Sequence, residues 1–150
     1  MKASTLWTQL VSTIKESPIL SVYVKQVFEG RRYDIEPESL PCIMLDPVRD
    51  GEIERRTGNV HNVYFTVNVY AFCNSNSNEF SKTIVGDDIY KGVLDVHNDL
   101  RACLISSNTL GDRCIDLLIE PVEFDTIEDK YTVRGLLMPI RILYRQQDGV

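Results

Sequence analysis

Hydrophobic positions recur at two different spacings along the chain, and this difference separates predicted helices from predicted strands. Near the N-terminus they lie three and four positions apart, which is typical of one face of a helix. We expect a helix from about Ser4 to Glu16, with Ser4 as its N-cap. Pro18 ends it, because the residue before a proline disfavours the helical conformation. The apolar face comprises Leu6, Trp7, Leu10, Val11 and Ile14.

A long β-strand is predicted from Val60 to Cys73, where apolar and polar residues alternate. At ~3.3 Å per residue such a strand extends roughly 45 Å, which is longer than one sheet face of a small domain requires. We therefore expect it to bend or to project at one end. One side carries His61, Val63, Phe65, Val67, Val69 and Ala71, and the other carries Asn62, Tyr64, Thr66, Asn68 and Tyr70.

Two shorter strands are predicted before it, from Ser21 to Phe28 and from Cys42 to Leu45, with an extended connector from Tyr33 to Leu40. Asp46 and Pro47 end the second of these strands. The stretch VRDGEIERRTG that follows is charged and lacks apolar periodicity. It is either an exposed loop or a protruding β-arm. The alternative to a contact role is that it is only a solvated hairpin.

The second half of the chain is predicted to hold a helix and a hairpin. A polar loop from Asn74 to Ser81 leads to a helix that opens at Asp87 or Asp88 and closes at Ser106 to Asn108. Its apolar stripe comprises Ile89, Val93, Val96, Leu100 and Leu104.

The predicted hairpin pairs a strand from Cys114 to Ile127 with one from Tyr131 to Arg145, joined at residues 128–130. Pro139 has no N–H group to donate within a sheet, so we place it at an edge or a bulge, and Pro121 makes the same demand on the partner strand. The element order predicts an α+β fold, with a mostly antiparallel sheet, two helices packed on one face and a long β-hairpin or arm.

Length and composition limit the class of protein. The chain has 150 residues, of which 43% are hydrophobic and 25% charged. These values predict one globular domain over residues 1–150. The net charge of −6 is the wrong sign for long-range attraction to nucleic acid. No apolar stretch approaches the ~18 residues that cross a membrane.

The sequence contains none of the common phosphate-binding, hydrolase or metalloprotease motifs. Cys42, Cys73, Cys103 and Cys114 lack the spacing of zinc or redox sites, and we expect free buried thiols, with disulfide pairing as the alternative. We predict no enzymatic activity, no catalytic residue, no metal site and no cofactor.

In its element order the chain resembles the tail terminator (tail completion) proteins of long-tailed bacteriophages. The likeness covers most of the chain and lies in its overall plan of a helix, a short strand, a charged loop, a long strand, a second helix and a final strand. The stretches that carry it are Leu40 to Leu45, Val63 to Tyr70, Val133 to Leu136 and Ile140 to Arg145.

The resemblance implies a structural virion protein that closes into a ring, commonly a hexamer, on the last ring of tail tube protein. Its other surface would meet the head connector or stopper protein, at the neck of a virion assembled in the host cytoplasm. DNA would only pass through the bore, where an acidic lining repels it. Another head-to-tail connector or stopper is the alternative. A third hypothesis is a small cytosolic enzyme or ligand-binding domain that uses Tyr64, Asn68 and Tyr70.

Ring closure requires that one patch of a subunit meets a different patch on its neighbour. Exposure and charge indicate two candidate contact surfaces, namely the charged stretch and the strand edge beside Pro139. The candidate interface residues are Arg49, Asp50, Glu52, Glu54, Arg55, Arg56, Pro139 and Arg141.

Overall fold

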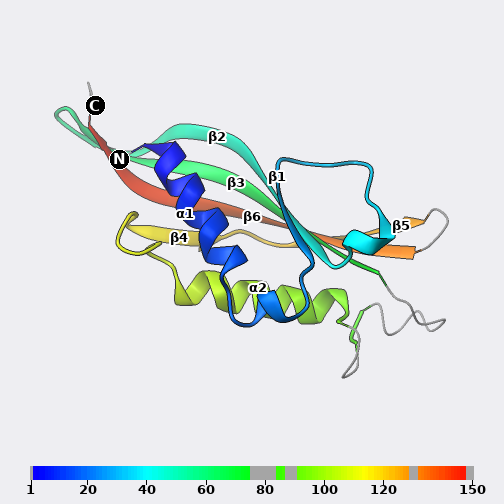
Figure 1. Cartoon of the computed structure of the whole chain (residues 1–150). Helices are drawn as coiled ribbons and strands as arrows, with labels where there is room; N and C mark the ends of the chain where they lie inside the picture. Colours follow the sequence, from blue (N-terminus) through cyan, green and yellow to red (C-terminus); the bar gives the residue numbers. More distant parts are fainter. Residues whose placement is uncertain (1, 75–83, 87–90, 129–131, 148–150) are drawn as a thin grey trace.

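The computed structural model describes residues 2–74, 84–86, 91–128 and 132–147. In these residues a twisted sheet is packed against two helices (Figure 1). The elements are α1 (Ala3–Lys15), η1 (Leu20–Val22), β1 (Gln26–Glu29), η2 (Pro37–Ser39), β2 (Cys42–Thr57), β3 (Val60–Asn74), α2 (Val93–Ser106), β4 (Asp116–Ile119), β5 (Glu123–Glu128) and β6 (Thr132–Gln147).

The described strands form one six-stranded sheet in the order β1-β2-β3-β6-β4, and β5 also pairs with β6. β1 runs parallel to β2, and every other pairing is antiparallel. β6 therefore lies inside the sheet, with β3 on one side and β4 and β5 in succession on the other. The predicted α+β class with a mostly antiparallel sheet is confirmed.

Both helices cover the same face of the sheet and form the main core with it. The predicted apolar side of β3, from His61 to Ala71, is the side that is buried. The core also contains the apolar stripe of α1 and that of α2, which comprise Leu6, Leu10, Val11, Ile14, Val93, Val96, Leu100, Cys103 and Leu104. Regular periodicity predicted these stripes because each element buries one face only. Of the predicted positions, Trp7 is partly buried and packs against the core, and Ile89 lies outside the described residues.

A smaller apolar cluster lies on the opposite face of the sheet, where Phe28 and Ile35 pack against it. It comprises Leu40, Cys42, Met44, Phe72 and Val133. Because Ile35 and Leu40 belong to the connector between β1 and β2, this connector covers one end of the second face.

The N-terminal elements differ from the sequence prediction at their ends. α1 begins at Ala3, and its N-cap is Lys2, which forms no capping hydrogen bond through its side chain, so Ser4 is not the N-cap. The strand predicted from Ser21 to Phe28 is also wrong in extent. Its first part belongs to the 3-10 turn η1, and β1 spans only four residues, each with a parallel partner in β2.

The second helix begins later than predicted. Its N-cap is Gly92, and the described residues before it are not helical, whereas Asp87 and Asp88 lie outside the described residues. Asp95 Oδ2 accepts hydrogen bonds from the backbone N–H groups of Gly92 (2.9 Å) and Gly86 (2.7 Å). This carboxylate fixes the start of the helix, because it satisfies N–H groups that would otherwise lack acceptors.

The predicted end of the second strand at Asp46 and Pro47 is also wrong, because β2 continues to Thr57. The charged stretch is thus part of a strand paired with β3, and the β-arm alternative is confirmed. The polar loop is predicted to begin at Asn74, but Asn74 is the last residue of β3. The rest of the predicted loop, residues 75–81, lies outside the described residues.

The strand predicted from Cys114 to Ile127 is interrupted. β4 and β5 are separated at residues 120–122, which include Pro121. Pro139 lies opposite this break, and its carbonyl accepts a 2.9 Å hydrogen bond from Glu120 N. The nitrogen of Pro139 also faces this break, where no neighbouring strand requires a backbone N–H donor. β5 and β6 form the predicted antiparallel pair.

Among the described residues, no helix combines the length and the apolar character needed to cross a membrane.

Candidate protein interface

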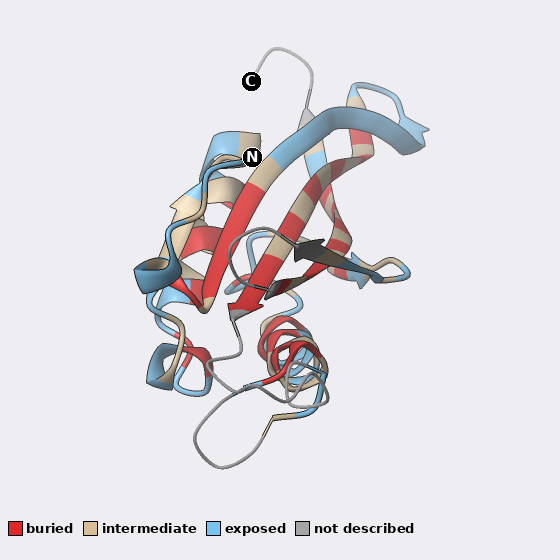
Figure 2. Ribbon diagram, turned by 90° about the vertical axis from the view of Figure 1, so that its right-hand side faces the viewer, coloured by how far each residue is buried: buried red, intermediate tan, exposed pale blue. Residues whose placement is uncertain are grey.

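The end of the sheet opposite β5 forms an arm, which we define as residues 47–66 of β2 and β3 together with residues 141–147 of β6. The helix-facing side chains at its base, such as Phe65 and Ile142, belong to the main core, and its tip extends beyond the helices. Every residue from 47 to 59 is exposed. Figure 2 shows β2 changing from buried to exposed along its length as it leaves the helix-covered part of the sheet. This exposure gives the arm a surface that other molecules can reach.

Three bulges shape the arm. The pairing of β2 with β3 shifts between Pro47 and Arg49, between Asp50 and Glu52, and between Ile53 and Arg55. Each shift adds one residue to β2, and the second falls at Gly51, whose φ of 94° suits glycine. Bulges increase the local twist of a ribbon and disrupt the spacing of its backbone groups.

The outer edge of the arm is β2, because β1 pairs only with residues 42–45 of that strand. Bulges and charged side chains make such an edge a poor template for an added strand. We therefore expect the arm to bind through its side chains rather than by adding a strand.

Two of the predicted interface residues have structural partners on the helix-facing side of the arm. The hydroxyl of Tyr144 donates a 2.7 Å hydrogen bond to Asp50 Oδ1. Burial, with Asp50 adding to it, raises the pKa of the Tyr144 phenol above its ordinary value. Arg56 Nε donates a 3.1 Å hydrogen bond to His61 Nδ1. Asp50 and Arg56 thus hold the arm together from within.

Arg141 is the centre of a second structural cluster on the opposite face. Its guanidinium lies 3.8 Å from the centroid of the Tyr64 ring. It also pairs with Glu52 at 3.0 Å and with Glu120 at 3.7 Å. The side chain of Arg141 therefore ties β2, β3 and the β4–β5 break to β6, and its charge is already compensated.

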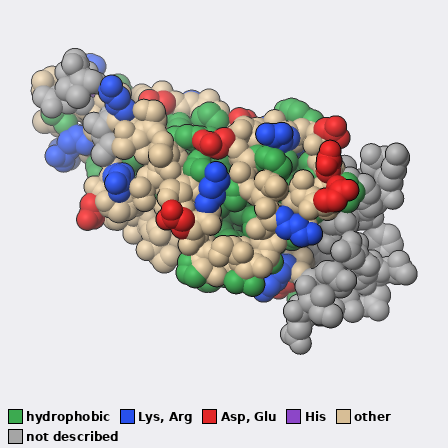
Figure 3. Space-filling model, viewed as in Figure 1, with side chains coloured by type: hydrophobic (Ala, Val, Ile, Leu, Met, Phe, Trp, Pro, Cys, Tyr) green, Lys and Arg blue, Asp and Glu red, His purple; other side chains and the backbone are tan. Residues whose placement is uncertain are grey.

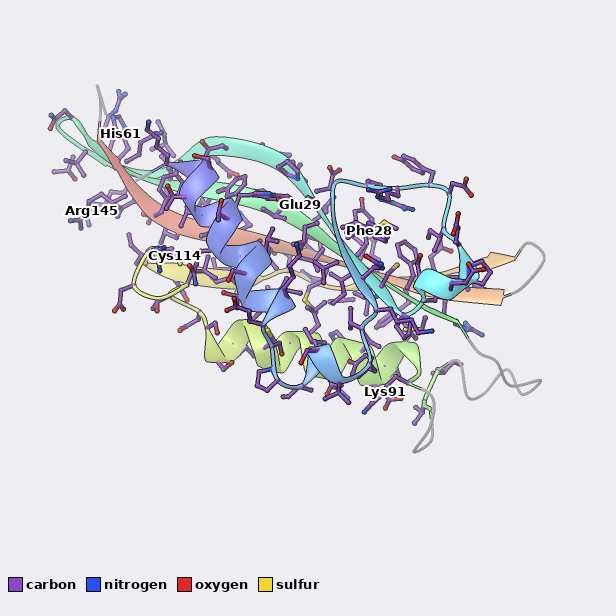
Figure 4. All side chains as sticks on the ribbon, viewed as in Figure 1. Phe28, Glu29, His61, Lys91, Cys114 and Arg145 are labelled. Carbon is purple, nitrogen blue, oxygen red and sulfur yellow. The ribbon has the colours of Figure 1, made fainter. Side chains whose placement is uncertain are left out.

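The tip of the arm has a different character. Arg55, Asn62 and Arg145 lie side by side on β2, β3 and β6, and with Thr57 and Val60 they line a depression of about 330 Å³. Arg55 and Arg145 are exposed and form no ion pair with another described residue. Arg145 lies on the arm, far from Lys91 near the start of α2 (Figure 4).

The remaining predicted residues fall into two groups. Arg49 and Glu54 are exposed on the arm, as the charged sequence suggested. Pro139 is half-buried in β6, which is an inner strand, so the prediction of an exposed strand edge beside it is wrong. The reason is that β4 and β5 both pair with β6 and leave only a break opposite Pro139.

A second depression, of about 230 Å³, lies at the other end of the same face. Its floor includes the parallel rings of Tyr70 and Phe72, whose centroids are 6.3 Å apart, with the Arg31 guanidinium above both. Glu123 and Asp125 of β5 lie at its border. Sequence reasoning missed this site, since only the strand register brings β5 beside these rings.

The three polar side chains on which the ligand-binding hypothesis rests, those of Tyr64, Asn68 and Tyr70, lie in two different places on the sheet. Asn68 Nδ2 donates a 3.4 Å hydrogen bond to the Tyr70 hydroxyl, and Tyr70 lines the second depression. Tyr64, in contrast, lies beneath Arg141. These three side chains therefore do not face one shared cavity.

The four thiols are free, and three of them are buried, as expected, whereas Cys114 is half-buried. Burial raises the pKa of Cys42 and of Cys114 to about 11 and that of Cys73 to about 12. Within the described part of the chain, no group of three or more His, Cys, Asp or Glu side chains is arranged to hold a metal ion.

A scan against models of known protein families and a search among curated proteins found no match to this chain.

Proposed function

We propose that this chain is a ring-forming structural protein of a virion, a tail terminator that caps the tail tube and joins it to the head connector. The observation that carries the proposal is the arm. A bulged, charged ribbon extends beyond the helix-covered core, and two arginines at its tip have no ion-pair partner among the described residues. Such an element is suited to contact with a neighbouring subunit.

The asymmetry of the sheet supports a ring. A closed ring is built from heterologous contacts, in which two different surfaces of one subunit meet. This chain has a projecting tip at one end of the sheet and an aromatic depression bordered by carboxylates at the other. The two surfaces differ in shape and in charge, as a head-to-tail contact requires.

The overall charge supports the role proposed for the bore. At a net charge of −6 the chain repels nucleic acid over long distances. A lumen with an excess of carboxylates would let DNA pass without retaining it. The order of elements, which resembles that of tail terminators, adds to this proposal.

The test combines the mass of the assembly with the length of the tube. Mass photometry of the purified chain with the tail tube protein of the same virus should show a species at a multiple of 17.2 kDa, and tubes of uniform length should form. A variant with reversed charge away from the arm, Lys15→Glu on α1, serves as the control. A chain that stays strictly monomeric and leaves tube length unchanged would refute the proposal.

The position of the protein in the virion separates a terminator from another connector. Cryo-electron microscopy of particles carrying a labelled chain should show the label at the head end of the tail tube. A label directly against the portal would instead assign the chain to the connector or stopper proteins.

A further inference from the structure

Two charged surfaces lie on the same face of the sheet, and their charged side chains form no ion pair with another described residue. The first is the depression at the arm tip. Arg55 on β2 and Arg145 on β6 both pair in register with Asn62 on β3, so their Cα atoms lie two strand spacings apart, or ~9.6 Å. Both side chains line the depression. This arrangement presents two guanidinium groups to an incoming anionic surface.

The second surface is an acidic strip on β5. Glu123 pairs with Leu137 and Asp125 with Gly135, so both carboxylates lie on the face that also carries Tyr70 and Phe72. Residues two apart on a strand are separated by ~6.7 Å. Both residues are exposed, and neither forms an ion pair with another described residue. The strip therefore offers two carboxylates at the border of the second depression, where the Arg31 guanidinium lies above the Tyr70 and Phe72 rings.

We infer that the arm tip of one copy binds the β5 strip of a second copy, with Arg55 and Arg145 of the first pairing with Glu123 and Asp125 of the other. Guanidinium and carboxylate groups form paired, charge-assisted hydrogen bonds. The Cα spacings of the two arginines and of the two acids differ by about 3 Å, and the long, flexible arginine side chains can span this difference so that both pairs form together. This inference deepens the proposed function, on which it rests, because it names the two surfaces that close the ring.

A single chain cannot make this contact with itself, because the two surfaces lie at opposite ends of the sheet. Arg145 lies near the end of β6, beyond the last residue that pairs with β4, and Arg55 lies level with it on β2. Glu123 and Asp125 pair with residues near the start of β6. On the helix-covered face, Asp and Glu side chains gather at the η2 end, but acidic and basic side chains are mixed over the rest of that face (Figure 3). Head-to-tail association therefore rests on the two surfaces of the opposite face alone.

A second copy explains the surfaces better than nucleic acid does. Phosphate binding would account for the two arginines, but it leaves the acidic strip on β5 without a role. The net charge of −6 also opposes an approach of DNA to the molecule as a whole.

The test is an exchange of charge between the surfaces. One variant carries Arg55→Glu and Arg145→Glu, and the other carries Glu123→Arg and Asp125→Arg. Each should remain folded by circular dichroism but lose at least tenfold in self-association by mass photometry at low salt. An equimolar mixture of the two variants should recover assembly as an alternating ring, because each new contact again joins opposite charges. A chain with all four substitutions should assemble by itself.

The control reverses charges of the same kind outside both surfaces, with Lys15→Glu and Glu16→Arg at the end of α1, and it should assemble like the wild type.

If both double variants assemble normally while the wild type forms rings, the inference is overturned and the proposed function stands. The inference also fails if the mixture and the fourfold variant stay monomeric although folded. If loss of the two arginines abolishes binding of a DNA duplex but not assembly, the tip is a phosphate site and the inference is again overturned. A wild-type chain that never associates overturns both proposals.

Discussion

The hydroxyl of Tyr144 reaches Asp50 Oδ1 across 94 positions of sequence, at a distance of 2.7 Å. Tyr144 is fully buried, whereas Asp50 is exposed on the arm. The bond therefore joins the last strand of the core to the middle of the bulged strand. It lies within the arm, where the buried helix-facing side of β6 meets the exposed part of β2.

Removing the two partners of this bond should have unequal effects. Tyr144→Phe loses a hydrogen bond to a charged group and should lower the free energy of unfolding by about 1–2 kcal/mol. Asp50→Ala leaves a buried hydroxyl without its acceptor and should cost about 1–3 kcal/mol. Urea denaturation measures both. Glu54→Ala, at an exposed bulge, should change stability by less than ~0.5 kcal/mol, and an equal loss in that variant would contradict the assignment.

Arg141 and Arg145 should separate stability from assembly. Arg141→Ala breaks the contacts to Tyr64, Glu52 and Glu120 and should cost about 1–2 kcal/mol in urea denaturation. Arg145→Ala should leave stability within ~0.5 kcal/mol and weaken self-association. The reverse pattern would show that the two arginines have been assigned the wrong roles.

Gly135 is expected to tolerate no side chain. A Cβ atom there would lie 2.8 Å from Cε1 of Phe72, which is buried in the second cluster. Gly135→Ala should therefore lower the melting temperature, with a loss of about 1–3 kcal/mol from overpacking. In a Phe72→Leu background the same change should cost much less, and an additive double mutant would rule out this steric explanation.

The thiols should react slowly in the native protein. At pH 8 a thiol with a pKa of about 11, such as that of Cys114, is ionised in only about one molecule in a thousand. With Ellman's reagent we expect one slow phase from half-buried Cys114 and still slower phases from the buried thiols. Cys114→Ser should remove the first phase alone. Four fast-reacting thiols before denaturation would contradict the burial.

Alkaline pH should destabilise the chain through Tyr23. Its hydroxyl donates a 2.8 Å hydrogen bond to Asp99 Oδ2, and burial and this carboxylate raise its pKa above the ordinary value of 10.0. Because the folded chain holds the proton more tightly, the stabilisation is complete below pH ~10 and is lost as pH rises above it. Tyr23→Phe should flatten the decrease in unfolding free energy between pH ~10 and ~11. An unchanged slope would exclude this tyrosine as a cause.

Sequence patterns predicted the core and failed where the backbone is irregular. The stripe of α1 and the alternation of β3 are regular because each has one buried face. In β2 the bulges add a residue at Val48, Gly51 and Glu54, and this breaks the alternation that would have identified a strand. The start of α2 depends on Asp95 capping backbone groups of a preceding segment, which periodicity does not detect.

The candidate surfaces were predictable only in part. Charge and lack of periodicity correctly indicated that the stretch around Arg55 is exposed. The sequence could not show that the Arg141 side chain already has partners within the chain, because Tyr64 and Glu120 come from other parts of the sequence. It also gave no reason to connect Glu123 with the ring of Tyr70, since that relationship depends on the register of three strands.

Unequal lengths within the β2–β3 ribbon have a geometric consequence. β2 has 16 residues, and its partners on β3 run only from Val60 to Phe72, so the outer strand carries more chain than the inner one over the same span. A two-stranded ribbon whose outer strand is longer curves toward the shorter strand, which here is β3. The direction in which the tip leans is then an inherent property of the monomer, and it would fix the angle between successive copies before they meet.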